Sequence, residues 1–279
     1  MFSRSPQFIE RTWRRLMTGF CFAVFGLGGI VLSVTALPLL RLRAKGDEDL
    51  RQRLARQLVK KSFVVFIKLM RFSGVFNFDF KALEETKNIR GKIVIANHPS
   101  LIDVVALISL VPNADCVVKA HLWRNPFMRG VIRSTGYISN GDPEGLIADC
   151  KRSLDQGNNL VIFPEGTRTA PGNSVRFRRG AANLALRTQK NLITFRILCD
   201  PPTLLKNEPW YCAPIRKPTL AIQYLREFDI TQYQTANNKV SIAARRLTRD
   251  LQTYYDKVLE INEQPEPGNQ STHYRVARS

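Results

Sequence analysis

One uncharged stretch near the N-terminus constrains the structure of this chain most. Leu16 to Leu40 is 25 residues long and contains no charged residue. As a helix it would extend about 37 Å, more than the hydrocarbon core of a bilayer, which is about 30 Å thick. Arginines flank the stretch on both sides, at Arg11, Arg14, Arg15, Arg41 and Arg43. The sequence therefore predicts an N-terminal membrane-embedded helical segment.

Three arrangements of this segment remain open. The first is one full span of the bilayer. The second is a re-entrant hairpin, bent at Gly26, Gly28, Gly29 or Pro38, which would keep both arginine groups on one side. The third is a cleaved signal peptide with its cleavage site at residues 34–36, which fits the long apolar run poorly.

The chain carries a large excess of positive charge. It has 42 Lys and Arg against 23 Asp and Glu, a net charge of +19. Such an excess favours an anionic partner, which could be nucleic acid, a bilayer surface or a phosphate-bearing substrate. Glu48 to Gly74 combines basic residues with apolar residues at helical spacing. We predict a basic amphipathic helix that lies on anionic lipid, with an ordinary core-facing helix as the alternative.

From Lys81 onward, short apolar runs alternate with helical patterns. Strands are expected at 92–96, 114–119, 136–139, 160–163, 192–198 and 218–225. Helices are expected at 101–110, 122–133, 143–156, 180–188 and 238–261. This alternation predicts an α/β fold in which helices cover a mixed sheet.

The five cysteines and three histidines do not form a metal-binding pattern. The cysteine count is odd and no two cysteines are spaced as C-x-x-C. A disulfide framework and a zinc site are therefore not expected. Small buried thiols in a reducing compartment are the simplest interpretation.

A histidine follows the first of the predicted strands. Residues 96–103 read ANHPSLID, so His98 lies between a strand and a helix, and Asp103 comes one turn later. If the ring folds back over the first helical turn, the Asp103 carboxylate can fix its tautomer and raise the basicity of its other nitrogen. Such a pair can take a proton from a hydroxyl group. The alternative is a capping histidine and a first-turn acid favoured by the helix dipole.

A second polar stretch follows the strand expected at 160–163. Residues 163–169 read FPEGTRT and offer a flexible glycine, hydroxyl donors, backbone amides and Arg168. That set suits a phosphate or a carboxylate. The alternative is a polar turn in which Glu165 pairs with Arg168.

Together the two stretches resemble the glycerol-phosphate and lysophospholipid acyltransferase superfamily, typified by bacterial 1-acylglycerol-phosphate acyltransferases. Residues 97–103 match the family's N-H-x4-D, and residues 163–168 match its F-P-E-G-T-R. Residues 177–181, FRRGA, are similar to its F-K-x-G-A. The resemblance covers about residues 75–225.

The resemblance implies a role for each matching residue. His98 would be the general base and Asp103 its orienting partner. The acceptor would be bound by Lys119, Glu165, Gly166, Thr167 and Arg168. Two positions depart from the family pattern: Asn140 stands where an arginine is common, and Phe195 where a proline is frequent. Losing the cation at position 140 weakens the expectation of a phosphate-monoester acceptor.

The implied domains are membrane-associated helices at 1–74, an acyltransferase catalytic domain at 75–261 and a disordered tail at 262–279. The implied activity is transfer of a fatty acyl group from acyl-CoA or acyl carrier protein to the hydroxyl of a lysophospholipid or related lyso-lipid. No cofactor and no metal are implied. Direct transfer is implied rather than a covalent intermediate on Ser100.

The implied location is the cytoplasmic (inner) membrane, with the catalytic domain on its cytoplasmic side. The lipid bilayer, the lyso-lipid and the acyl donor are the expected partners. A catalytically inactive lipid-binding or scaffold relative is one rival hypothesis. A basic nucleic-acid-binding protein is the other, although no nucleic-acid motif is recognisable and nucleic acid is not an expected partner.

Overall fold

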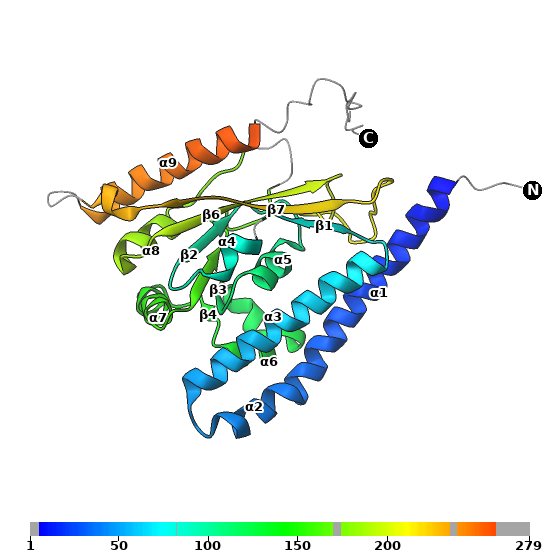
Figure 1. Ribbon diagram of the computed structural model, residues 1–279, viewed down its shortest axis with the longest axis horizontal. Helices are drawn as coiled ribbons and strands as arrows, with labels where there is room; N and C mark the ends of the chain where they lie inside the picture. The colour runs from blue at the N-terminus through cyan, green and yellow to red at the C-terminus, as the bar shows by residue number, and fades with distance from the viewer. Residues whose placement is uncertain (1–5, 82, 170–173, 235–238, 261–279) are drawn as a thin grey trace, which may run out of the picture.

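A seven-stranded sheet organises the part of the chain that the structure describes (Figure 1). The computed structural model describes residues 6–81, 83–169, 174–234 and 239–260, so the predicted tail at 262–279 lies outside the described residues. The strand order is β1-β7-β6-β2-β5-β3-β4. All neighbouring strands are parallel except β6 and β7, which are antiparallel. The predicted mixed α/β sheet is confirmed.

The strands agree with the sequence-based expectation to within three residues at each end, apart from one that was not predicted. They are β1 (Asn77–Phe80), β2 (Ile93–Ala96), β3 (Ala114–Val118), β4 (Ile138–Ser139), β5 (Asn159–Ile162), β6 (Leu192–Asp200) and β7 (Thr219–Phe228). The unpredicted strand is β1, which pairs with β7 at the sheet edge. Its four residues, NFDF, alternate between polar and apolar side chains.

Helices cover both faces of the sheet (Figure 1). One face carries α3 (Glu48–Phe72), α5 (Asp103–Leu110) and α6 (Pro126–Thr135), which share an apolar core with the sheet. The other face carries α7 (Pro143–Asp155), α8 (Gly180–Thr188) and α9 (Val240–Glu260). The remaining short elements are α4 (Leu83–Lys87), η1 (Ala120–Arg124) and η2 (Ile230–Tyr233).

Two predicted helix starts were wrong. The helix expected from residue 101 begins at Asp103, so Pro99 lies in the preceding turn rather than in the first helical turn. The helix expected at 122–133 is divided: η1 covers residues 120–124 and α6 starts at Pro126. Proline fits the first position of a helix because its missing N–H would have no helical partner there.

The apolar N-terminal stretch forms a long helix that lies along the domain. α1 (Pro6–Val34) continues through Gly26, Gly28 and Gly29 without a break, and α2 (Ala36–Ala44) follows it. The chain reverses only at residues 45–47, so no hairpin forms within Leu16–Leu40. α3 then returns beside α1 (Figure 1). Among the described residues, the helical stretch Gln7–Ala44 is long and apolar enough to cross a bilayer.

α3 packs one face against the sheet, as a core-facing helix does. Its buried side chains include Phe66, Ile67 and Met70, which belong to the same apolar cluster as the sheet residues. Its outer face is exposed and mixes Val65 and Phe72 with lysines. The two interpretations of Glu48–Gly74 therefore describe opposite faces of one helix.

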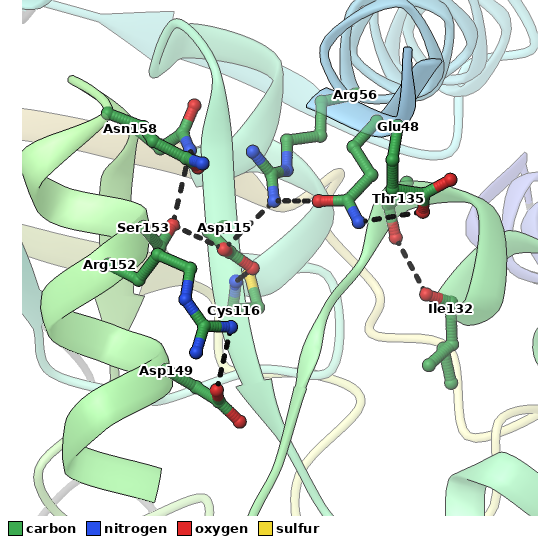
Figure 2. A network of polar contacts seen from close by, with 12 residues as sticks. Glu48, Arg56, Asp115, Cys116, Ile132, Thr135, Asp149, Arg152, Ser153 and Asn158 are labelled. Atoms are coloured by element: carbon green, nitrogen blue, oxygen red, sulfur yellow. Dashed lines mark hydrogen bonds and ion pairs between the residues drawn. The ribbon is translucent and has the colours of Figure 1, made fainter. Parts of the chain in front are cut away.

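A buried ion pair ties α3 to the sheet (Figure 2). Arg56 of α3 donates to the Asp115 carboxylate of β3 at 3.0 Å, and the two side chains are 4% and 1% exposed. Ser153 of α7 donates to the same Asp115 oxygen at 2.6 Å. The other oxygen accepts the Cys116 N–H at 2.8 Å. A buried carboxylate with three donors is well compensated, so three elements are held at one point.

Candidate active site

The histidine and the aspartate predicted to meet do meet at the end of β2. His98 Nδ1 lies 2.9 Å from Asp103 Oδ2. The same Asp103 oxygen accepts the Ser100 N–H at 2.6 Å. The His98 ring packs against Phe163 with a centroid distance of 4.4 Å, and its side chain is 14% exposed. With Nδ1 held by Asp103, Nε2 is the ring nitrogen that remains for a substrate, since no hydrogen bond to it occurs within the described part of the chain.

A side chain fixes where β2 ends. Asn97 is buried, and its amide donates to the Ile197 carbonyl at 2.8 Å while its oxygen accepts the Ile197 N–H at 2.8 Å. The side chain thus replaces one step of the β2–β6 ladder, which ends at Ala96 and Phe195. The backbone therefore leaves the sheet at His98, immediately after the end of β2.

Glu165 links the two motifs. One carboxylate oxygen accepts the His98 N–H at 2.7 Å, and the other accepts the Thr169 hydroxyl. The Thr169 N–H in turn donates to the His98 carbonyl at 3.0 Å. Glu165 is 4% exposed. The alternative in which Glu165 pairs with Arg168 is wrong, because the folded loop brings His98 and Thr169 to its oxygens instead.

The other residues of this loop have different surroundings. Gly166 is exposed and has φ = +70°, a left-handed conformation that favours glycine. Thr167 is half-buried. Arg168 is half-buried and donates through Nη1 to the carbonyls of Leu204 and Leu205 at 2.8 and 3.1 Å. One side of its guanidinium therefore anchors the loop that follows β6.

Lys119 lies at the same edge of the sheet. β2, β5 and β3 are parallel neighbours, so their carboxyl ends, which lead to His98, to the Phe163–Thr169 loop and to Lys119, face the same way. Lys119 is exposed. At the next strand end the Asn140 side chain accepts the Ala120 N–H at 3.0 Å. Position 140 thus caps the start of η1 and contributes no positive charge.

Burial governs the electrostatics of both carboxyl groups. It raises the pKa of Asp103, against the opposing effects of His98, the Ser100 N–H and Arg168. It also raises the pKa of Glu165, against the hydrogen bonds from Thr169 and His98. Carboxylates in such sites remain charged only where donors compensate for lost hydration, so removing a donor is costly.

A serine and a cysteine lie near His98, and neither is activated as a nucleophile. Ser100 is fully buried and its hydroxyl donates to the Thr203 carbonyl at 3.0 Å. Burial raises the pKa of the Cys199 thiol to about 12. A thiol that stays protonated is a poor nucleophile. No group of three or more potential metal-binding side chains occurs in the part of the chain that the structure describes.

The contacts that Thr169 and α9 make in this site were not predicted. Thr169 directly follows the recognised motif, so its closing hydrogen bonds could have been suspected from position alone. Tyr255 of α9 is fully buried, and its hydroxyl contacts the carbonyls of Ile95 and Phe195 at 3.2 and 2.8 Å. No local sequence signal indicates that contact, because 160 positions separate Tyr255 from Ile95.

Comparison with known proteins agrees with this geometry. The sequence profile of the acyltransferase family matches residues 77–198. A 1-acyl-sn-glycerol-3-phosphate acyltransferase from Helicobacter pylori is 36% identical over 105 residues, which cover 35% of this chain and 44% of that protein. The corresponding enzyme of Cocos nucifera is 31% identical over 116 residues, covering 39% and 37%. The chain thus spans less than half the length of these curated relatives.

A solved structure shares the fold over nearly the whole chain. It is the crystal structure of the 1-acyl-sn-glycerophosphate acyltransferase PlsC from Thermotoga maritima, with a TM-score of 0.63 and 19% sequence identity. The match covers 89% of this chain and 95% of that one. The profile matched over residues 77–198, the relatives and the shared fold support the resemblance to the glycerol-phosphate acyltransferase superfamily.

Proposed function

We propose that this protein is a membrane-associated O-acyltransferase of the 1-acylglycerol-3-phosphate type. It moves a fatty acyl group from a thioester, either acyl-CoA or acyl carrier protein, to the hydroxyl of a lysophospholipid or related lyso-lipid. The named relatives, 1-acyl-sn-glycerol-3-phosphate acyltransferases, support the reaction class. The observation that carries the proposal is the 2.9 Å contact between His98 Nδ1 and Asp103 Oδ2 at an open strand end.

The proposed reaction needs one base and no covalent enzyme intermediate. His98 Nε2 takes the proton of the acceptor hydroxyl as that oxygen attacks the thioester carbonyl. Asp103 stabilises the imidazolium that forms. The tetrahedral intermediate collapses, the C–S bond breaks, and the thiolate leaves and receives the proton from His98. The buried, hydrogen-bonded Ser100 hydroxyl supports direct transfer over an acyl-serine route.

The acceptor is proposed to lie beside Gly166, Thr167 and Arg168, with Lys119 contributing charge from the neighbouring strand end. Glu165 acts differently from what the family resemblance implies. Both of its oxygens are engaged by His98 and Thr169, so its proposed role is to hold the two loops together.

The proposed mode of membrane association follows from how α1 is used. One face of α1 is anchored to the domain: Arg11 donates to the Ala213 carbonyl at 3.0 Å and Arg14 to the Pro214 carbonyl at 3.3 Å. The opposite face exposes large apolar side chains at Trp13, Leu16, Phe20, Val24, Leu27, Val31 and Val34. These positions recur every three or four residues, so they form one stripe along the helix.

A helix fixed to a folded domain along its length cannot cross a bilayer alone. We therefore place the α1 stripe in the surface of an anionic membrane, with the basic outer face of α3 beside it. The proposed location is the cytoplasmic face of the cytoplasmic membrane, where acyl-CoA and acyl carrier protein are present.

The catalytic proposal is tested with His98→Ala protein in native-like membranes, given a labelled acyl thioester and lyso-lipids. Loss of transfer is expected, and transfer near the unmodified rate would remove the proposed base. Ser100→Ala should keep most of the activity. A trapped acyl-serine in the unmodified protein would favour the covalent route instead.

The membrane proposal is tested with two added charges on the stripe, Leu27→Glu and Val31→Glu together. This variant should no longer sediment with vesicles that contain phosphatidylglycerol. Val240→Glu and Ile242→Glu together are the matched control, since both residues are exposed on α9, on the opposite face of the sheet from α1 (Figure 1). If the stripe variant sediments like the control, the stripe does not bind the membrane.

A further inference from the structure

Arg178 lies beside the loop that holds the proposed acceptor site. Its N–H donates to the Pro164 carbonyl at 2.9 Å. Its side chain lies over Gly166, because a Cβ atom added to that glycine would be 3.3 Å from Arg178 Nε and 3.5 Å from Cζ. Both Arg178 and Arg168 are therefore close to Gly166, which is a residue of the loop that follows β5.

The Arg178 guanidinium is available for a ligand. It is exposed, and within the described ranges it forms neither an ion pair nor a side-chain hydrogen bond. The acid closest to it in the loop, Glu165, already accepts from His98 and Thr169. A guanidinium beside an exposed glycine presents several N–H donors to an anion without steric obstruction.

The segment that carries Arg178 is fixed by α9. Gln252 accepts the Phe177 N–H at 2.8 Å and donates to the Val175 carbonyl. The Phe177 ring packs edge-on against Tyr255 at a centroid distance of 4.8 Å. The backbone on the N-terminal side of Arg178 is therefore held by a helix outside residues 77–198, to which the family profile matches.

The other cations of the proposed site are Lys119, which is exposed at the end of β3, and Arg168. Arg168 Nη1 is engaged by the carbonyls of Leu204 and Leu205. Asn140 replaces the cation that the family commonly has at the end of β4, and its side chain is engaged by Ala120. Beside Gly166, on the β5 side of the site, Arg178 therefore adds a guanidinium that has no side-chain partner among the described residues.

We propose that Arg178 binds a phosphate group on the acceptor lipid, and that Gln252 is the positioning residue that holds Arg178 over Gly166. This inference deepens the proposed function and rests on it. It assigns Arg178, beside Gly166, as a further cation for the headgroup phosphate in addition to Lys119.

The test compares two acceptors with one acyl-CoA donor: 1-acylglycerol-3-phosphate, and 1-acylglycerol, which lacks the phosphate. Arg178→Gln should raise the KM for the phosphate acceptor about 10- to 100-fold, the effect of losing a charge-assisted hydrogen bond. The kcat value and the KM for 1-acylglycerol should not change. Arg178→Lys should restore part of the affinity, since it restores the charge but not the planar fork.

Arg176→Gln is the matched control, because it removes the same charge from an exposed position two residues away. If both glutamine variants raise the KM for the phosphate acceptor equally, general charge rather than the Arg178 contact is responsible and the proposal fails. A rise in the KM for acyl-CoA alone would assign Arg178 to a phosphate of the donor and would also overturn it.

The positioning role of Gln252 is tested by comparing the KM values of single and double variants. Gln252→Met should raise the KM for the phosphate acceptor in the unmodified background and add nothing to Arg178→Gln, because both changes disable the same contact. Thr253→Ala, an exposed neighbour on α9, should leave both constants unchanged. Independent, multiplying effects of Gln252→Met and Arg178→Gln would refute the positioning role.

These outcomes separate this inference from the proposed function. If the unmodified protein acylates neither acceptor, the proposed function fails. If it acylates 1-acylglycerol-3-phosphate and Arg178→Gln behaves like Arg176→Gln, the proposed function stands and the role of Arg178 alone is wrong.

Discussion

Asp103→Asn separates the two effects that a carboxylate has on a catalytic histidine: orienting the ring and stabilising its charge. Asp103 Oδ2 accepts both the His98 Nδ1–H at 2.9 Å and the Ser100 N–H at 2.6 Å. An asparagine amide turned with its NH2 toward Ser100 would place two donors at that short distance. The amide oxygen must therefore stay at the Oδ2 position, where it still accepts from both groups.

The expected loss of kcat follows from this orientation of the amide. His98 keeps its tautomer in the variant, so only the negative charge is lost. An imidazolium and a carboxylate about 4 Å apart interact by about 4 kcal/mol at an effective dielectric constant of about 20, which equals about 10³ in rate. The neutral hydrogen bond retains part of that stabilisation. The kcat value should fall about 10²- to 10³-fold, less than the loss of about 10⁴ known where such a substitution changes the tautomer.

The assay is kcat at saturating acyl-CoA and acceptor, with His98→Ala as the lower reference. A kcat within about threefold of the unmodified protein would show that the carboxylate charge contributes little to the transition state. A kcat equal to that of His98→Ala would show that the tautomer was lost and that the Ser100 N–H does not fix the amide. Either result refutes the reasoning.

Three further substitutions test the surrounding structure. In Glu165→Gln the amide oxygen can still accept the His98 N–H, and the NH2 group can donate to the Thr169 hydroxyl, so kcat should stay within about threefold; a much larger loss would show that its charge acts on the substrate. Burial raises the pKa of Glu165 above its ordinary 4.5, so its contribution to the free energy of unfolding falls as pH rises from there through the folded-state pKa, and Glu165→Gln should remove that slope in urea titrations. Arg56→Met leaves a buried carboxylate without its ion-pair partner and should lower the free energy of unfolding by about 3–5 kcal/mol, measured by urea in detergent; a loss below about 1 kcal/mol would contradict this. Tyr255→Phe removes the donor to two buried carbonyls and should cost about 1–3 kcal/mol in the same experiment without changing the acceptor KM.

Most of the secondary structure could be predicted because it depends on local patterns. The run at 160–162 is wholly apolar, and the run at 192–199 is apolar apart from Thr194 and Arg196, as is usual for strands in the middle of a sheet. The helix at 180–188 was predicted with its observed bounds. The contact between His98 and Asp103 was also predictable, since five positions and one turn of backbone separate them. β1 was the one described strand that was not predicted.

The sequence by itself determined most of the helices and strands, the contact between His98 and Asp103 and the resemblance to acyltransferases, because each depends on residues close together in the chain. Only the tertiary structure decided that Glu165 holds the His98 loop, 67 positions away, and that Gln252 holds Phe177, 75 positions away. The same is true of α1, which lies along the domain instead of leaving it. Such contacts depend on strand order and on which helix covers which face. Those choices are made by the packing of the whole core, and no short stretch of sequence encodes them.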